Sequence, residues 1–293
     1  MELNSADGQG LISPEMAKLW AEDMHLNYTP CSFVVRTVFV KGNLVPFDFK
    51  EYAKEHGITT IKDRYGTEYN INDVDVLLSE SQFKMAKYYS SWEGYLSYHR
   101  SYNLKWGVAR YNKEFDDEYV LTNYQYIQVL NLNKEEIDGL ISYTADWIKN
   151  ICSGNLEYAL AYSIGVKNPT SGVDDIINSC GSLFTKAIIK NPEMLKDGFV
   201  QRKIYNSIKE SIRQAKIGRI WVKGNYQFMI SDPVAQCRSA LGLSPDGLIP
   251  ANCVYSNFWN TRTNSDEVVC CRSPLTHYSE VNPLKLFNSE ETN

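Results

Sequence analysis

The spacing of apolar residues changes twice along the chain, and these two changes constrain the fold more than any other feature. Residues 31–49 are rich in Val and Phe and are interrupted by the turn residues Lys41-Gly42-Asn43, which predicts two short strands joined by a turn at these residues. From about residue 76 to 219, apolar residues recur every three or four positions, which predicts helices. After Ile220, short apolar runs separated by Pro, Gly and Asp again predict strands. The sequence therefore predicts an α+β protein with strands at both ends and helices between them.

Neither end segment contains enough strands to close a barrel by itself, which favours one β-domain interrupted by a helical insertion. We expect residues 1–75 to form the first part of this domain, residues 76–220 the insertion, and residues 221–293 the remaining strands and a C-terminal tail. Six aromatic residues would share one stripe of an unbroken helix in the insertion: Tyr88, Trp92, Tyr95, Tyr98, Tyr102 and Trp106. Such a stripe can pack into a core or stack nucleic-acid bases.

The distribution of charge matters more than the formal net charge of −5, which by itself argues against a nucleic-acid-binding protein. Residues 183–224 contain ten Lys or Arg but only three Asp or Glu. A charge run of this kind is commonly the solvated face of a helix, and the alternative is a surface that faces nucleic acid. Under the second interpretation, Lys186, Lys190 and Lys203 are candidates for contacts with phosphate.

The seven cysteines form no C-x-x-C pair and have no histidine at the spacing of a zinc site. The N-terminal residues do not look like a secretion signal, so we expect reduced thiols and not a disulfide framework. No apolar run reaches the length of about 18 residues that a membrane-spanning helix needs. The sequence therefore predicts a cytoplasmic protein without a membrane partner and without a metal of its own.

Several short segments that contain Gly or basic residues lie near the two ends of the chain. They are DGQGLIS at residues 7–13, Arg36 with Lys41-Gly42 and Asp48, and the segments RSALG, DGL and RSPLTH at residues 238–242, 246–248 and 272–277. Together they resemble the first barrel of the two-barrel RNA polymerases, a group that includes the RNA-dependent RNA polymerases of eukaryotic RNA silencing and related single-chain phage enzymes. The matching elements are D-G-x-G-x-I-S, R-x-x-x-x-K-G and R-N-P-x-x-H. The resemblance implies a double-psi β-barrel interrupted by the helical insertion.

In that family the first barrel contributes lysines to the active site. Lys41 matches the family motif directly and Lys18 matches more loosely, so the resemblance implies catalytic roles for both. It also implies contacts with nucleic acid or phosphate for Arg36, Arg272 and His277. Simpler alternatives stay open for four of these positions: an exposed hairpin lysine for Lys41, a lysine without a catalytic role for Lys18, a solvated outward-facing arginine for Arg36, and a structural, hydrogen-bonded histidine for His277.

The chain departs from the family pattern in two places. Ser273 replaces the Asn of R-N-P, and residues 278–280, which read YSE, stand where P-G-D usually follows. The family's D-x-D-G-D loop, whose carboxylates hold catalytic Mg²⁺, has no counterpart in the sequence. The resemblance therefore implies that this chain alone binds no metal, and that Mg²⁺ enters with a second barrel or subunit carrying D-x-D-G-D.

These observations lead us to expect a fragment or split subunit of an RNA polymerase, a nucleotidyltransferase of transcription that is inactive alone. Its partners would be the acidic segment, a nucleic-acid template, the RNA product and nucleoside triphosphates. If the protein is phage-encoded, it would act in the host cytoplasm or be carried in the virion. The alternatives are a non-catalytic nucleic-acid-binding module that uses the basic region, and a structural or assembly protein.

Overall fold

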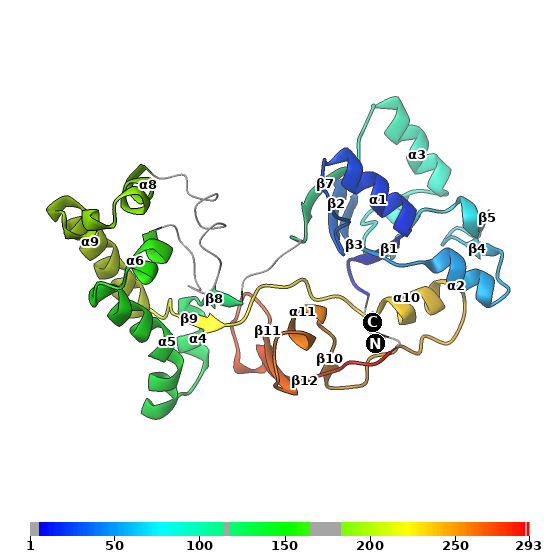
Figure 1. The fold of residues 1–293 in the computed structure, drawn as a ribbon. Helices are drawn as coiled ribbons and strands as arrows, with labels where there is room; N and C mark the ends of the chain where they lie inside the picture. The colour runs from blue at the N-terminus through cyan, green and yellow to red at the C-terminus, as the bar shows by residue number, and fades with distance from the viewer. Residues whose placement is uncertain (1–5, 114–117, 164–182, 291, 293) are drawn as a thin grey trace. The chain divides into compact units, whose positions relative to one another are not determined.

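The computed structural model describes residues 6–113, 118–163, 183–290 and 292, and these residues form an α+β protein (Figure 1). The chain divides into two compact units. Unit 1 comprises Met1–Phe115, Gln227–Glu267 and Leu284–Asn293, and unit 2 comprises Asp116–Tyr226 and Val268–Pro283. Parts of the expected insertion, residues 114–117 and 164–182 with Cys180, lie outside the described residues. The domain boundaries expected from the sequence stay a prediction.

A five-stranded sheet with the order β6-β1-β3-β2-β7 forms the centre of unit 1. Its strands are β1 (Gln9–Ile12), β2 (Phe33–Thr37), β3 (Val40–Pro46), β6 (Val76–Leu77) and β7 (Gly107–Tyr111). β1 and β3 run parallel, and the other neighbours are antiparallel.

The described residues also form three smaller sheets. Two of them have two strands each: β4 (Thr60–Lys62) with β5 (Glu68–Asn70), and β8 (Tyr119–Leu121) with β9 (Trp221–Lys223). The third has the order β10-β12-β11 and consists of β10 (Cys253–Val254), β12 (Val281–Leu286) and β11 (Glu267–Cys271). Within the described part of the chain, none of the sheets closes into a barrel. The barrel implied by the resemblance therefore stays a prediction.

The turn between β2 and β3 lies at a different place from the one that the sequence predicts. Thr37 pairs with Val40, so the chain reverses at Val38-Phe39, where Phe39 adopts a positive φ of 62°. Lys41 and Gly42, which we expected in the turn, instead belong to β3. The prediction of two strands in this segment is confirmed, and the prediction of their connection is wrong.

The helix expected to carry the aromatic stripe ends earlier than the sequence predicts. α3 (Trp92–Ser101) is followed by Asn103, whose φ is 48°. The backbone N–H of Leu104 donates to the carbonyl of His99 at 2.9 Å, which completes a Schellman motif and stops the helix. Tyr95 is buried in a core with Phe83, whereas Tyr88, Tyr98 and Tyr102 are exposed. The chain then enters β7, inside a region that the periodicity predicted to be helical.

Side-chain caps begin the main helices of unit 1. The helices are α1 (Pro14–Asp23), α2 (Phe49–Glu55), α3, α10 (Pro233–Ala240) and α11 (Asn257–Asn260), with short 3₁₀ turns at Ile71–Asp73 and Ala86–Tyr88. The Ser13 hydroxyl accepts the N–H of Met16, and the Asp48 carboxylate accepts the N–H of Glu51. Each such cap satisfies a backbone donor that the first helical turn leaves unpaired.

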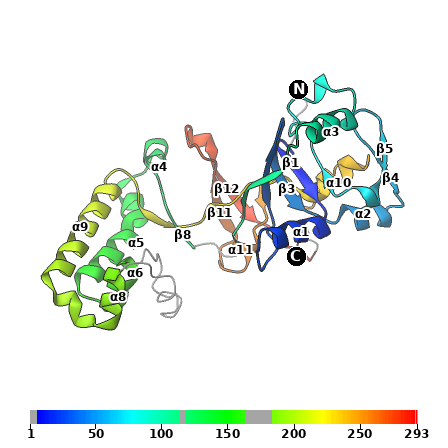
Figure 2. The same ribbon diagram turned by 90° about the horizontal axis from the view of Figure 1, so that it is seen from above.

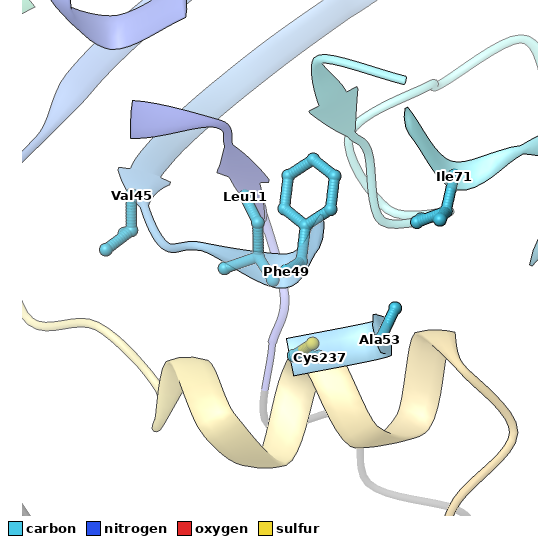
Figure 3. Packing of buried hydrophobic residues seen from close by; sticks show 6 residues of the cluster. All are labelled: Leu11, Val45, Phe49, Ala53, Ile71 and Cys237. Atoms are coloured by element: carbon cyan, nitrogen blue, oxygen red, sulfur yellow. The ribbon is translucent and has the colours of Figure 1, made fainter. Parts of the chain in front are cut away.

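Each face of the central sheet carries an apolar cluster where β1 pairs with β3. Adjacent residues of these strands belong to different clusters, because they point to opposite faces. Ile12 and Leu44 pack with Phe33 and the α1 residue Ala17 on one face. The other face carries a cluster of β1, β3, α2, α10 and 3₁₀ side chains, drawn in Figure 3: Leu11, Val45, Phe49, Ala53, Ile71 and Cys237. α2 and α10 thus cover this face where β1 pairs with β3.

Cys237 gives a simple test of this packing. Its thiol is fully buried in the cluster of Figure 3, and burial raises the pKa of Cys237 to about 12. Because the thiolate is the reactive form, we expect Cys237 to stay unmodified during brief treatment of the folded protein with iodoacetamide at pH 8. Exposed Cys31 and Cys152 are expected to react. Peptide mass spectrometry measures the modification, and unfolding in urea should make Cys237 reactive. Rapid labelling of Cys237 before unfolding would contradict the packing.

Buried Gln9 connects the first strand to a helix near the other end of the chain. Its side-chain oxygen accepts the N–H of Ser231 at 2.7 Å, and its Nε2 donates to Gln236 Oε1 at 2.8 Å. Gln236 Nε2 in turn donates to the carbonyl of Gln9 at 3.0 Å. These paired hydrogen bonds hold α10 against β1 and satisfy buried polar groups.

Unit 2 is mainly helical. Its elements besides β8 and β9 include α4 (Tyr124–Val129), α5 (Lys134–Cys152), α6 (Leu156–Ser163), α8 (Leu183–Lys190), α9 (Gly198–Ala215) and 3₁₀ turns at Pro192–Lys196 and Tyr278–Glu280. α9 lies beside α5 and α6, where Ile208 packs with Trp147, Ile151 and Ala161 (Figure 2). Among the described helices, none is long and apolar enough to cross a membrane.

Candidate functional site

The glycines of the two N-terminal motifs surround one buried side chain, Gln82. A Cβ atom on Gly10 would collide with the Leu77 carbonyl oxygen and with Gln82 Oε1, and one on Gly42 would collide with the Gly8 carbonyl oxygen and the Gln82 amide. Gln82 Nε2 donates to the Asn43 carbonyl at 3.0 Å. Gly10 and Gly42 are therefore required for close packing, and only Gly8, with a φ of 71°, serves as a turn glycine.

Lys41 lies in β3 directly beside this packed segment. Its backbone N–H donates to the Gln82 carbonyl at 3.1 Å on one side, and on the other side β3 pairs with β2. Its side chain is exposed. The backbone of Lys41 is thus held from two directions while the ammonium group stays accessible.

Arg36 is the cross-strand partner of Lys41. Directly opposed residues of an antiparallel pair project from the same face with Cβ atoms about 5 Å apart, and two like charges in this arrangement destabilise the sheet. Within the described residues, no carboxylate forms an ion pair with either side chain. An exposed pair of cations with this geometry can bind an anion that bridges them, such as a phosphate group.

Arg110 extends the same face onto β7. It pairs with Val34, which lies two residues before Arg36 on β2 and therefore projects from the same face. Gly107 lies opposite Arg36 and contributes no side chain that could cover it. Arg36, Lys41 and Arg110 are all exposed, and we call them the basic face.

The loop that carries Arg272 and His277 belongs to unit 2 and is organised by Glu280. Its carboxylate accepts the backbone N–H groups of Thr276 and His277, and these hydrogen bonds hold the pKa of Glu280 below its usual value. His277 caps the 3₁₀ turn through its ring nitrogen, which accepts the N–H of Ser279 at 3.2 Å. This contact gives His277 a structural role, and Arg272 is exposed beside it.

The remaining predicted residues lie elsewhere. Lys18 is exposed on α1, and this helix covers the face of the sheet opposite to the one from which Lys41 projects. Lys186 and Lys190 are exposed on α8. Lys203 on α9 lies over the rings of Phe184 and Phe199, with its Nζ 5.2 and 5.5 Å from the ring centres.

Two comparisons identify the family. A family model described as RNA dependent RNA polymerase matches residues 4–292. This chain belongs to the RNA-dependent RNA polymerase family. The DNA-directed RNA polymerase YonO of Bacillus phage SPbeta is 30% identical to it over 264 residues, which are 88% of this chain and 29% of that polymerase. The chain therefore spans less than a third of the length of this relative.

Clusters of potential metal ligands are absent from the described residues of this family member. Within residues 6–113, 118–163, 183–290 and 292, no group of three or more His, Cys, Asp or Glu side chains could hold a metal ion. Unit 1 does contain a groove of about 820 Å³, lined by acids such as Asp63 and Asp75 and by aromatic residues such as Trp20 and Trp92. Lys50 pairs with Asp75 at 2.9 Å, and the residues of the basic face do not line this groove.

The sequence pattern does not indicate two residues of this candidate site, Arg110 and Gln82. Arg110 lies in a segment whose periodicity predicts helix, so its strand register could not be anticipated. Gln82 was not singled out because a buried Gln leaves no short motif. Gly10 and Gly42 could have indicated that a buried side chain packs against them, since a glycine inside a strand often marks the close approach of another group.

Proposed function

We propose that this chain is the part of an RNA polymerase that supplies positive charge to the active site, while the metal-binding carboxylates come from another segment or chain. The single observation that carries this proposal is the opposed pair Arg36 and Lys41 in a member of the polymerase family. The pair has no acidic partner within the described residues and is exposed on a rigid sheet.

Nucleotidyl transfer requires positively charged groups close to the reacting phosphates. In nucleotidyl transfer, the 3′-hydroxyl oxygen of the growing strand loses its proton and forms a bond to the α-phosphorus of a nucleoside triphosphate. The bond from that phosphorus to pyrophosphate breaks, and pyrophosphate leaves with the electron pair. Cations fixed before the reaction stabilise the negative charge on these phosphate oxygens. We assign this role to Lys41 and assign Arg36 and Arg110 to binding of the triphosphate or the strand.

The finer parts of the proposal follow from the resemblance. The first sheet would belong to a double-psi β-barrel, and Mg²⁺ would be held by a D-x-D-G-D segment of a second barrel or subunit. Lys18 would be a second active-site lysine. Arg272, His277, Lys186, Lys190 and Lys203 would face nucleic acid.

The proposal is tested by combining this chain with a polypeptide that carries the D-x-D-G-D segment. We expect no incorporation of labelled nucleotide by the chain alone, and Mg²⁺-dependent RNA synthesis on a supplied template by the combination. Primer extension resolved on a gel measures both. Incorporation by the chain alone would overturn the division of roles. A combination that binds template without synthesis would favour the alternative function, a non-catalytic nucleic-acid-binding module.

A further inference from the structure

The exposed side of α9 carries an ordered row of polar and basic residues. Val200, Ile204 and Ile208 face the helical core of unit 2. Residues three or four positions apart share one side of a helix, and the row on the outward side follows this spacing. It consists of Arg202, Asn206, Lys209, Arg213 and Lys216, all outside the core, and we call it the α9 row.

The length of the α9 row suits an extended phosphate backbone. Arg202 and Lys216 are separated by about 21 Å along the axis, since each helical residue rises about 1.5 Å. The acid on this helix, Glu210, lies beside Arg213 at 3.7 Å and also accepts a hydrogen bond from Gln214. Glu210 offsets one of the four positive charges of the row. The α9 row therefore keeps a net positive charge.

A hollow beside the α9 row adds an apolar surface to this charge. It has a volume of about 410 Å³, and Tyr205, Ile208 and Ile212 contribute to its lining together with Lys209 and Arg213. Tyr205 is 63% exposed. Proteins that bind single-stranded nucleic acid combine a positive groove with an exposed aromatic ring on which a base can stack. The paired bases of a duplex do not offer their faces in this way.

We propose that the α9 row and Tyr205 bind a single strand of nucleic acid, with the cations on its phosphates and a base stacked on Tyr205. This site lies in unit 2, whereas the basic face belongs to unit 1. The cations of this site belong to the basic region 183–224 but are not the three lysines that the sequence singled out, of which Lys203 lies over two aromatic rings. The inference does not depend on the role of Lys41.

The test uses the full chain and a fluorescein-labelled thymidine 20-mer, with binding measured by fluorescence anisotropy from 50 to 300 mM NaCl. The variant replaces Arg202, Lys209, Arg213 and Lys216 by Gln. We expect the affinity at 100 mM salt to fall by at least about tenfold, and the slope of log affinity against log salt to become shallower by roughly 2–3, since each phosphate contact contributes about 0.7. Tyr205→Ala is expected to weaken binding by about fivefold or more with an unchanged slope.

The matched control replaces four exposed lysines, each in an ion pair, by Gln: Lys54, Lys62, Lys149 and Lys196. This control removes the same net charge as the α9 row variant, and we expect it to bind the labelled 20-mer like the unmodified chain. A second control, Arg202→Lys with Arg213→Lys, keeps the charge and is expected to retain binding. Circular dichroism checks that each variant is folded.

Three results would overturn the proposal. The first is unchanged binding by the α9 row variant. The second is an equal loss in the ion-pair control, which would show that only total charge matters. The third is tighter binding of a 20-base-pair duplex with no effect of Tyr205→Ala, which would mean that the surface grips a duplex backbone instead of a single strand.

Discussion

Replacing Lys41 by Ala in the complete polymerase is expected to lower the rate of RNA synthesis by about a hundredfold or more. The backbone of Lys41 is held by Gln82 and by β2, so the point from which its side chain leaves the sheet is fixed before the substrate arrives. Removing one preorganised donor that stabilises developing charge typically costs about 10²- to 10³-fold in catalytic rate. Single-turnover incorporation of a labelled nucleotide at saturating triphosphate measures this step apart from binding.

The control variant is Lys54→Ala, which removes an exposed lysine of α2 that pairs with Glu51. We expect this control to retain full activity. Arg36→Ala and Arg110→Ala are expected to raise the KM for nucleoside triphosphate more than they lower the maximal rate, since we assign both residues to binding. Full activity of the Lys41→Ala enzyme is incompatible with the assigned role of Lys41.

Replacing Gly10 by Ala is expected to reduce the free energy of unfolding by about 2–3 kcal/mol, because the added methyl group has no room. It would meet the backbone oxygen of Leu77 and the Oε1 atom of buried Gln82. Backbone atoms of the sheet must then move, and the hydrogen bonds of Gln82 weaken with them. Urea unfolding followed by circular dichroism measures the loss, and amide hydrogen exchange in β1 and β3 assigns it to unit 1.

The matched control is Gly107→Ala, in the same sheet. There the nearest atom to an added Cβ is the Arg36 carbonyl oxygen at 3.7 Å, an ordinary contact. We expect the free energy of unfolding to change by less than about 0.5 kcal/mol. Equal stability of the Gly10→Ala and Gly107→Ala proteins would refute the packing described around Gln82.

The sequence predicted those features of the fold that depend on neighbouring residues alone. The strands at residues 31–49 follow from their Val and Phe content, and the outward position of Arg36 follows from its alternation with buried neighbours. The turn was misplaced because Lys41-Gly42 has the composition of a turn, while its glycine serves packing against Gln82. A glycine required for close approach looks identical in sequence to a glycine required for positive φ.

The candidate site was only partly predictable for a related reason. Lys41 and Arg36 lie five residues apart, so one hairpin brings them together. Arg110 joins them through a pairing with β2 across more than 70 residues, and a register shift between Val34 and Val35 helps decide which face it occupies. Likewise, the end of α3 depends on Asn103 in a left-handed conformation, which periodicity does not reveal. Long-range register and single backbone conformations leave no pattern along the chain.

The hydrogen bonds between Gln9 and Gln236 have a consequence for how the protein folds during synthesis. The two residues are separated by 227 positions, so β1 cannot complete its buried polar contacts until α10 has left the ribosome. Translation at about 5–20 residues per second delays this event by at least roughly ten seconds after β1 appears. During that interval the apolar side of β1 and β3 that α10 will cover stays open. We therefore expect the nascent N-terminal strands to expose apolar surface, which favours aggregation, during that interval.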